Sequence, residues 1–215
     1  MIMMMIKGSV ILPAPDLPAR PPASRIVGVL LAAGAGRRAG GPKALRVDAD
    51  GTSCLERSIT VLRDGGCDAV IVVLGCEAAR ARDLLASSAR ATDPATTLVD
   101  APGWQQGMGS SLHSGLLAAR ALPWRAVLVH LVDLPDVTAE VVGRMIRQSP
   151  SDTSALARAT YGGHPGHPVL IGRNHLELIM VRLSGDVGAK GYLAQHGASG
   201  VECGDLAGGQ DRDNQ

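Results

Sequence analysis

The sequence predicts an α/β fold: a doubly wound, mostly parallel sheet with helices on both faces and a small β-containing lobe after it. Continuous apolar runs at residues 26–34, 68–75 and 126–133 are typical of strands buried on both faces. Segments with helical spacing alternate with these runs, as in parallel sheets. After residue 149 this alternation stops, which predicts the smaller lobe.

The first strand, residues 26–34, runs into a loop rich in Gly and Arg. A helix is expected at residues 53–66, where apolar residues recur at helical spacing and a Gly pair closes the segment. The remaining elements of the sheet come in order along the chain. They are a strand at 68–75, a helix at 77–91, a strand at 96–100, a helix at 109–122, and a strand at 126–133.

The lobe is expected to contain strands at residues 153–161 and 167–172, which flank the turn-rich stretch YGGHPGHP. Two helices are predicted near residues 173–183 and 187–196. A short final strand is placed around Val201. We expect this lobe to lie over the acceptor side of the site.

Composition excludes several classes of protein. The formal net charge is +1, and Lys and Arg are scattered, so a nucleic-acid partner is not expected. No run approaches the ~18 apolar residues of a membrane span, so no membrane partner is expected. The four cysteines form no CxxC pair, which indicates buried thiols in a reducing, cytoplasmic location. Residues 13–22 are rich in Pro and Ala, and residues 1–24 are predicted to be a disordered extension before a single domain at 25–215.

The segment LLAAGAGRRAGGPKAL, residues 30–45, comes directly after the first buried strand, where an open parallel sheet binds its ligand. Glycines such as Gly34 and Gly36 let backbone N–H groups approach a polyphosphate. Arg38 and Lys43 add the positive charge that amides lack. Together these features favour a triphosphate over a neutral ligand.

Two known glycine-rich motifs partly match this loop. A Walker A loop fails, because Pro42 occupies the Lys position and Ala44 follows Lys43. A dinucleotide-binding fingerprint begins correctly, but Ala39 stands where its third Gly is needed. The dinucleotide fingerprint and a purely structural Gly-rich turn stay open as alternatives.

The segment resembles the signature of MobA-like NTP transferases: LAAG, then GxR, Gly, and PK before a Leu. The resemblance implies a Rossmann-like fold of the nucleotide-diphospho-sugar transferase type and a Mg²⁺-dependent nucleotidylyltransferase. It implies that Arg38 and Lys43 are catalytic residues, because they would bind the phosphates. It also places seven residues at the nucleotide: Leu31, Ala32, Ala33, Gly34, Gly36, Arg38 and Lys43.

A metal ligand is predicted where the strand at 126–133 ends. A carboxylate such as Asp133 is costly to bury unless it is paired or binds a cation, and Mg²⁺ prefers oxygen ligands. The alternative role, a helix cap, can be filled by Asp136 or Thr138 instead. Asp133 with Pro135 also resembles the metal-binding motif of the family. The resemblance thus makes Asp133 catalytic as well.

The C-terminus supplies a second candidate metal ligand. Asp211 and Asp213 resemble the Asp-x-Asp of related enzymes, in which Thr-Pro-Glu-Asp comes next. Here Asn214 and Gln215 replace the start of that second motif. Asp213 is a predicted ligand, and a solvated acidic tail is the alternative.

Residues 104–116 resemble the family segment that lines the nucleobase. Gly107, Gly109, Ser110 and Ser111 are expected to contact the base, and a capped helix start is the alternative. The Ala-Ala-Gly of the first loop and the Gly-Ser-Ser here resemble the cytidylyl branch, so CTP is favoured over GTP.

On the acceptor side, the resemblance places His167, Pro168 and Asp186. The alternatives are a structural hydrogen bond for His167 and a helix cap for Asp186. The implied acceptor is molybdopterin, and a molybdoenzyme or its maturation chaperone is the implied partner. A sugar or alditol phosphate acceptor and a non-catalytic nucleotide-binding module remain the other hypotheses.

Overall fold

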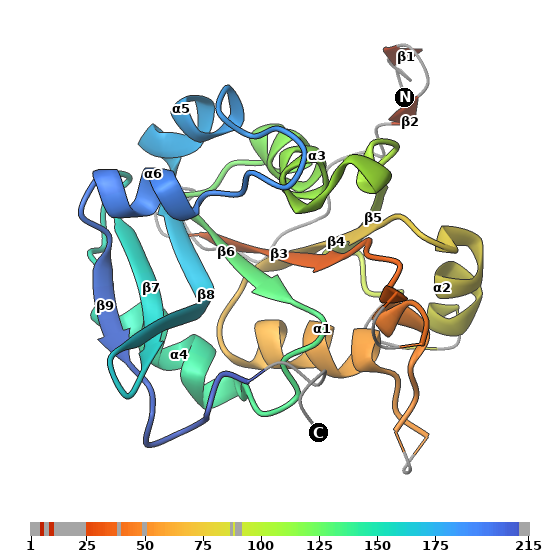
Figure 1. Ribbon diagram of the computed structural model, residues 1–215, viewed down its shortest axis with the longest axis horizontal. Helices are drawn as coiled ribbons and strands as arrows, with labels where there is room; N and C mark the ends of the chain where they lie inside the picture. Colours follow the sequence, from red (N-terminus) through yellow and green to blue (C-terminus); the bar gives the residue numbers. More distant parts are fainter. Residues whose placement is uncertain are drawn as a thin grey trace.

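A computed structural model describes residues 5–6, 9–10, 25–37, 40–48, 51–86, 88 and 92–210. A seven-stranded sheet with the order β5-β4-β3-β6-β8-β7-β9 forms the centre of the molecule (Figure 1). Four parallel strands make up one half: β3 (Ile26–Ala32), β4 (Ala69–Leu74), β5 (Thr96–Asp100) and β6 (Ala126–Leu131). Strands β3 and β4 and most of β6 are buried, as their apolar runs predicted.

The strands predicted for a separate lobe continue this sheet. They are β7 (Leu156–Tyr161), β8 (His164–Gly172) and β9 (Ser199–Glu202). Strand β8 pairs antiparallel with both β6 and β7. The predicted turn-rich stretch shrinks to Gly162 and Gly163, whose φ angles of 57° and 79° suit a tight hairpin turn. The strand therefore begins at His164 rather than at residue 167.

Helices cover both faces of the sheet (Figure 1). Helices α1 (Cys54–Asp64), α2 (Ala78–Leu85) and α4 (Ala139–Gln148) pack on one face. Helices α3 (Met108–Arg120), α5 (Leu176–Met180) and α6 (Lys190–Gln195) pack on the other. Two apolar cores result, and this arrangement confirms the predicted doubly wound α/β class.

Several helices are shorter than their sequence patterns suggested. Helix α2 ends at Leu85, whereas residues 77–91 were predicted. The segment 173–183 splits into a 3₁₀ turn, η5 (Arg173–His175), and the five-residue α5. Helix α6 begins at Lys190 rather than at Val187, because residues 184–187 form a tight turn closed by Val187 N–H and the Ser184 carbonyl.

The N-terminal prediction falls mostly outside the described residues. Two short strands, β1 (Met5–Ile6) and β2 (Ser9–Val10), pair antiparallel there. In the described part of the chain, no helix combines the length and the apolar character needed to span a bilayer.

Candidate active site

Two loops leave the same edge of the sheet at its centre. Strands β3 and β6 are parallel neighbours, and Leu31 lies opposite Leu131. Val132 N–H extends the pairing to the Leu31 carbonyl at 3.2 Å. Strand order reverses here, since β4 flanks β3 on one side and β6 on the other. Such switch points are where open α/β sheets bind ligands.

The loop after β3 is shaped by its glycines. Gly36 has a φ of 56°, and its carbonyl accepts the N–H of Gly41 at 3.1 Å. A Cβ atom on Gly36 would lie 1.9 Å from the Gly41 carbonyl oxygen, so only glycine fits there. Among the described residues, the N–H groups of Gly34 and Ala35 have no acceptor. This turn therefore leaves backbone donors available to an anion.

Lys43 opens the 3₁₀ turn η3 (Lys43–Leu45), which comes after this loop. Its Nζ donates to Oδ2 of Asp133 at 2.7 Å. Only 13% of the Lys43 side chain and 19% of the Asp133 side chain are exposed. The predicted phosphate lysine and the predicted metal ligand thus touch, although they belong to different loops.

The other residues predicted for the first loop have different positions. Leu31, Ala32 and Ala33 are buried at the end of β3, so only their backbone can face a ligand. Gly34 is exposed, and a Cβ atom there would meet no atom within 4 Å. Arg38 lies outside the described residues.

The predicted base-side segment lies at the N-terminus of α3. Gly107 precedes the helix, and Gly109 is buried. Ser111 is also buried, and its hydroxyl donates to the Gly107 carbonyl at 3.5 Å. Ser110 is half-buried, and its hydroxyl donates to Gln106 Oε1 at 3.3 Å. Of the two serines, Ser110 has the hydroxyl better placed for an external ligand.

Trp104 is the first residue of the predicted base-lining segment, but it was not among the residues expected to contact the base. It lies in the 3₁₀ turn η4 (Trp104–Gln106) and packs on Gly75, where a Cβ atom would lie 2.7 Å from the Trp104 ring. The same Cβ would lie 2.6 Å from the Ala33 carbonyl oxygen. The indole therefore packs beside the start of the glycine loop.

Asp186, predicted on the acceptor side, lies against the start of α3. A Cβ atom on Gly107 would lie 2.2 Å from Asp186 Oδ1, and Gly109 N–H donates to the Gly185 carbonyl at 2.8 Å. The alternative of a cap on the next helix is wrong, because α6 is preceded by Ala189. The glycines at 107 and 109 are needed for this close packing.

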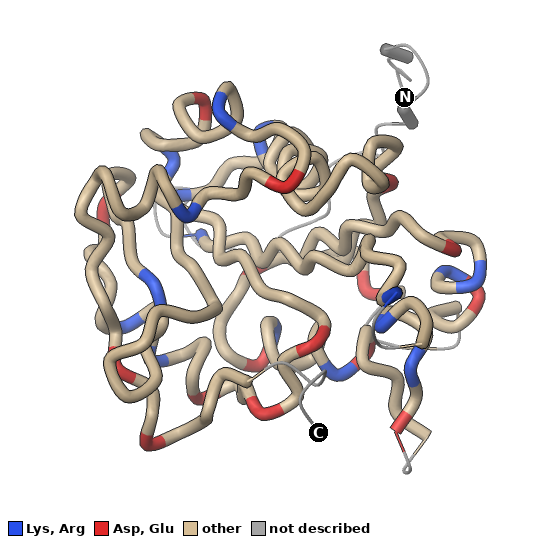
Figure 2. Tube along the Cα trace, in the orientation of Figure 1, with Lys and Arg blue, Asp and Glu red and all other residues tan. Residues whose placement is uncertain are grey.

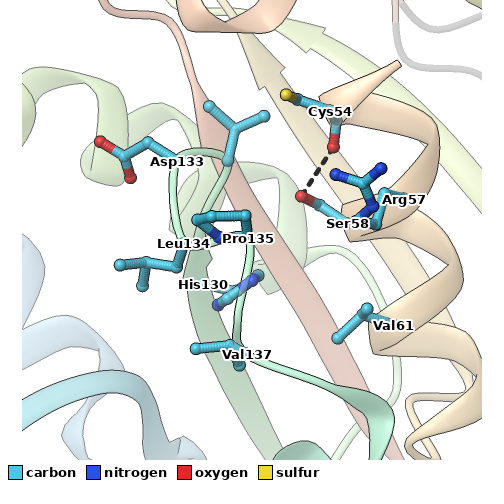
Figure 3. A pocket seen from close by; sticks show the side chains of 10 residues that line it. Cys54, Arg57, Ser58, Val61, His130, Asp133, Leu134, Pro135 and Val137 are labelled. Atoms are coloured by element: carbon cyan, nitrogen blue, oxygen red, sulfur yellow. Dashed lines mark hydrogen bonds between the residues drawn. The ribbon is translucent and has the colours of Figure 1, made fainter. Parts of the chain in front are cut away.

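A buried histidine near Asp133 was missed from the sequence. His130 on β6 is 1% exposed, and its Nδ1 has no hydrogen-bond partner among the described residues. It lines a cavity of about 10 Å³ between β6 and α1, together with Asp133 (Figure 3). Burial, with a smaller effect of His167, lowers the pKa of His130 to about 3. The sequence feature that could have pointed to His130 is a polar residue inside an otherwise apolar strand.

His167 and Pro168 lie on β8, the strand next to β6. The His167 carbonyl accepts the hydroxyl of Tyr161 at 2.6 Å. Burial, helped by the charge of Arg158, lowers the pKa of His167 to about 4. His167 is therefore neutral near pH 7. Pro168 is buried and is joined to His167 by a cis peptide bond.

Asp136 does not cap α4. Its Oδ2 accepts the N–H groups of Gly208 and Gly209 at 2.7 and 2.9 Å. Thr138 precedes the helix, but its side chain makes no capping hydrogen bond. Asp136 thus anchors the end of the described chain to the loop that carries Asp133. Asp211 and Asp213 lie outside the described residues.

Comparisons with known proteins give a family match over most of the chain. Residues 28–200 match the model of the MobA-like NTP transferase domain, which is most of the chain. The chain belongs to the MobA-like NTP transferase family. This result confirms the predicted family and the predicted enzyme class, a nucleotidyltransferase.

This family member has relatives with known names and structures. Nicotine blue oxidoreductase of Paenarthrobacter nicotinovorans is 35% identical over 196 residues, 87% of this chain and 92% of that protein. Rv0371c from Mycobacterium tuberculosis H37Rv has a TM-score of 0.68 at 26% identity, covering 84% of this chain and 89% of Rv0371c. A nucleotidyl transferase from Methanothermobacter thermautotroptrophicus, with a TM-score of 0.66 at 20% identity over 83% and 87% of the two chains, supports the fold.

The residues of this NTP transferase fit a divalent metal. Among the described residues, no three His, Cys, Asp or Glu side chains gather closely enough to hold an ion alone. Mg²⁺, however, is usually bound by one or two carboxylates together with substrate phosphates and waters. Asp133, held at the sheet edge by a cation, has the right donor chemistry. Rv0371c has also been solved in complex with manganese, at 26% identity and a TM-score of 0.62.

Charged side chains are otherwise mixed over the described chain. Figure 2 shows Lys and Arg interspersed with Asp and Glu, without a face of one sign in this view. This view therefore shows no broad basic face that would attract a polyanion.

Proposed function

We propose that this protein transfers CMP from CTP to a phosphorylated acceptor, molybdopterin, with release of pyrophosphate. The observation that carries the proposal is the contact between Lys43 and Asp133. It brings a phosphate-binding cation and an oxygen ligand for a metal to one point beside the glycine loop. Such a site suits phosphoryl and nucleotidyl transfer, where positioning and charge neutralisation do most of the catalysis.

The reaction needs no covalent bond to the protein. An oxygen of the acceptor phosphate attacks the α-phosphorus of CTP, and a new O–P bond forms. The bond from the α-phosphorus to the oxygen that bridges to the β-phosphate breaks, and its electron pair leaves with pyrophosphate. The protein has to align these groups and stabilise the charge that develops on the leaving group.

The proposed roles of the residues rest on the positions of the described side chains and, for Arg38 and Asp213, on the resemblance alone. Backbone N–H groups near Gly34 and the ammonium of Lys43 would contact the β- and γ-phosphates. Arg38 is proposed to add a second cation. Asp133, with Asp213 as a second ligand, would hold Mg²⁺, which supplies neutralisation of phosphate charge.

The choice of CTP rests on the resemblance of Ala32-Ala33-Gly34 and Gly109-Ser110-Ser111 to the cytidylyl branch. His167, Pro168 and Asp186 are proposed to border the acceptor, and Asp186 already packs on the base-side segment. A cytoplasmic location and a molybdoenzyme or its chaperone as recipient belong to the same proposal.

The test is an acceptor screen with radiolabelled CTP and Mg²⁺. Molybdopterin, sugar phosphates and alditol phosphates are offered in turn, with GTP in place of CTP in parallel reactions. We expect pyrophosphate release with CTP and molybdopterin, and none in EDTA. A preference for GTP would refute the base assignment, and metal-dependent CTP binding without release for any acceptor would indicate a non-catalytic module.

A second candidate, an oxidoreductase, has one observation in its favour. The relative that is 35% identical over most of its length is named nicotine blue oxidoreductase. The alternative predicts electron transfer between nicotine blue and a nicotinamide cofactor. Oxidation of NADH or NADPH in the presence of nicotine blue, without pyrophosphate release from any NTP, would favour it over nucleotidyl transfer.

A further inference from the structure

In the proposed reaction Lys43 binds phosphate and Asp133 binds the metal, yet in this structure the two side chains bind each other. Lys43 Nζ lies 2.7 Å from Asp133 Oδ2, and both side chains are mostly shielded from water. Mg²⁺ would approach the same carboxylate to about 2.0–2.1 Å. The ammonium therefore occupies one of the two carboxylate oxygens to which the metal would bind.

We infer that Lys43 is a placeholder cation, which competes with the divalent metal for Asp133 until a triphosphate draws it away. The inference rests on the proposed function, because the triphosphate and the metal are taken from it. The physical basis is repulsion between two cations on one carboxylate, together with the cost of leaving a largely buried Asp133 unpaired.

Arg57 is a described cation with which Lys43 can be compared. Arg57 lines the same cavity as Asp133, but its guanidinium pairs with Asp48. In Figure 3, Arg57 lies on α1 beside Ser58, and the Asp133 carboxylate points away from it. Removing Arg57 thus removes a nearby positive charge without removing a hydrogen bond to Asp133.

Because Lys43 and Asp133 exchange partners, binding of the triphosphate and binding of the metal are coupled. While Lys43 holds Asp133, it is less available to phosphate, and Asp133 is less available to metal. A triphosphate that engages Lys43 frees Asp133, and a metal on Asp133 frees Lys43. Because linkage is reciprocal, each ligand raises the affinity for the other by the same factor.

The first experiment measures Mn²⁺ binding to the full-length protein without nucleotide, from the electron paramagnetic resonance of free Mn²⁺. We expect Lys43→Met to bind Mn²⁺ roughly tenfold more tightly than wild type, because it loses a charge-assisted hydrogen bond that competes with the metal. Lys43→Gln serves as a second variant if Lys43→Met melts early. Arg57→Met is the matched control, and we expect its affinity to change by less than about threefold.

The second experiment measures CTP binding in EDTA by calorimetry. Asp133→Asn removes the charge that holds Lys43 at the metal site, so it should bind CTP roughly tenfold more tightly than wild type without metal. Equal or weaker Mn²⁺ binding by both Lys43 variants, or a gain as large in Arg57→Met, would overturn the inference and leave the proposed function standing. If no form of the protein binds either Mn²⁺ or CTP, the proposed function fails and the inference fails with it.

Discussion

A Cβ atom on Gly107 would lie 2.2 Å from Oδ1 of Asp186. The N-terminus of α3 and the turn at residues 184–187 are therefore packed without room for a side chain between them. Gly109 N–H, which donates to the Gly185 carbonyl at 2.8 Å, fixes their relative position. The segment proposed for the base and the segment proposed for the acceptor consequently cannot move independently.

Replacement of Gly107 tests this packing. Gly107 has a φ of 132°, which a side chain rarely adopts, so Gly107→Ala adds backbone strain to the clash. We expect a loss of about 2–3 kcal/mol and a Tm lower by roughly 4–10 °C in a thermal melt. Gly191→Ala is the control, because a Cβ atom there meets nothing within 4 Å. Equal melting of the two variants would contradict the packing argument.

Loss of either charge at the site should abolish most of the catalysis. We expect Lys43→Ala and Asp133→Asn each to lower kcat by about 10²–10³, the usual effect of removing one preorganised electrostatic partner. Circular dichroism should stay native, since both side chains lie at the sheet edge rather than in a core. Arg120→Gln, which removes a cation on the far end of α3, should retain wild-type turnover. A near-normal kcat in Lys43→Ala or in Asp133→Asn would refute the proposed mechanism.

His130 should make the protein sensitive to mild acid. Its pKa falls from 6.5 to about 3 in the folded protein because burial disfavours the charged ring. The unfolded chain therefore takes up the proton first, and stability declines as the pH falls from 6.5 toward 3. This one group contributes a slope of up to about 1.4 kcal/mol per pH unit.

His130→Leu should remove that contribution. At pH 7 the variant should be as stable as wild type or more so, because an unpartnered polar atom of the described chain is replaced by an apolar group. Urea unfolding at pH 7 and at pH 5 compares the two proteins. His167, with a pKa of about 4, titrates in both proteins. Parallel pH profiles would show that His130 does not carry the effect.

Glu202 should stabilise the β7–β8 turn in a pH-dependent way. Its carboxylate accepts hydrogen bonds from the Thr160 hydroxyl and from three backbone N–H groups: Gly162, Gly163 and Gly204. The Thr160 hydroxyl, with these N–H groups as smaller contributions, lowers the pKa of Glu202 from 4.5 to about 2. The stabilisation is complete above pH 4.5 and disappears as the pH falls toward 2.

Glu202→Gln should therefore melt below wild type at pH 7, and the gap in Tm should close on acidification. Thr160→Val, which removes one of the four donors, should show a smaller gap of the same sign. In the double variant the two losses should not add, because both act through one carboxylate. A gap that stays constant from pH 7 to pH 3 would rule out a role for the Glu202 charge.

Much of the fold was predictable because its signals are local. The apolar runs at β3, β4 and β6 identify strands buried on both faces, and helical spacing identifies α1 and α3. The predictions failed where tertiary contacts compete with local pattern. The turn at residues 184–187 packs on α3 and shortens α6, and β7–β9 join the main sheet instead of forming a lobe.

The site was predictable only in part for the same reason. The glycine loop is visible in the sequence, since only glycine tolerates the backbone at Gly36. His130 escaped notice because burial cannot be inferred for one polar residue in a strand, and Asp136 looked like a helix cap until its partners, Gly208 and Gly209, were known.

By itself, the sequence determined most of the strands and helices, the glycine loop, and the family to which the chain belongs, because these depend on neighbouring residues. Only the tertiary structure decided that Lys43 meets Asp133, 90 positions away. The physical reason is strand pairing: hydrogen bonds place β6 beside β3 in parallel, so their carboxyl ends, and the charges just beyond them, share one edge.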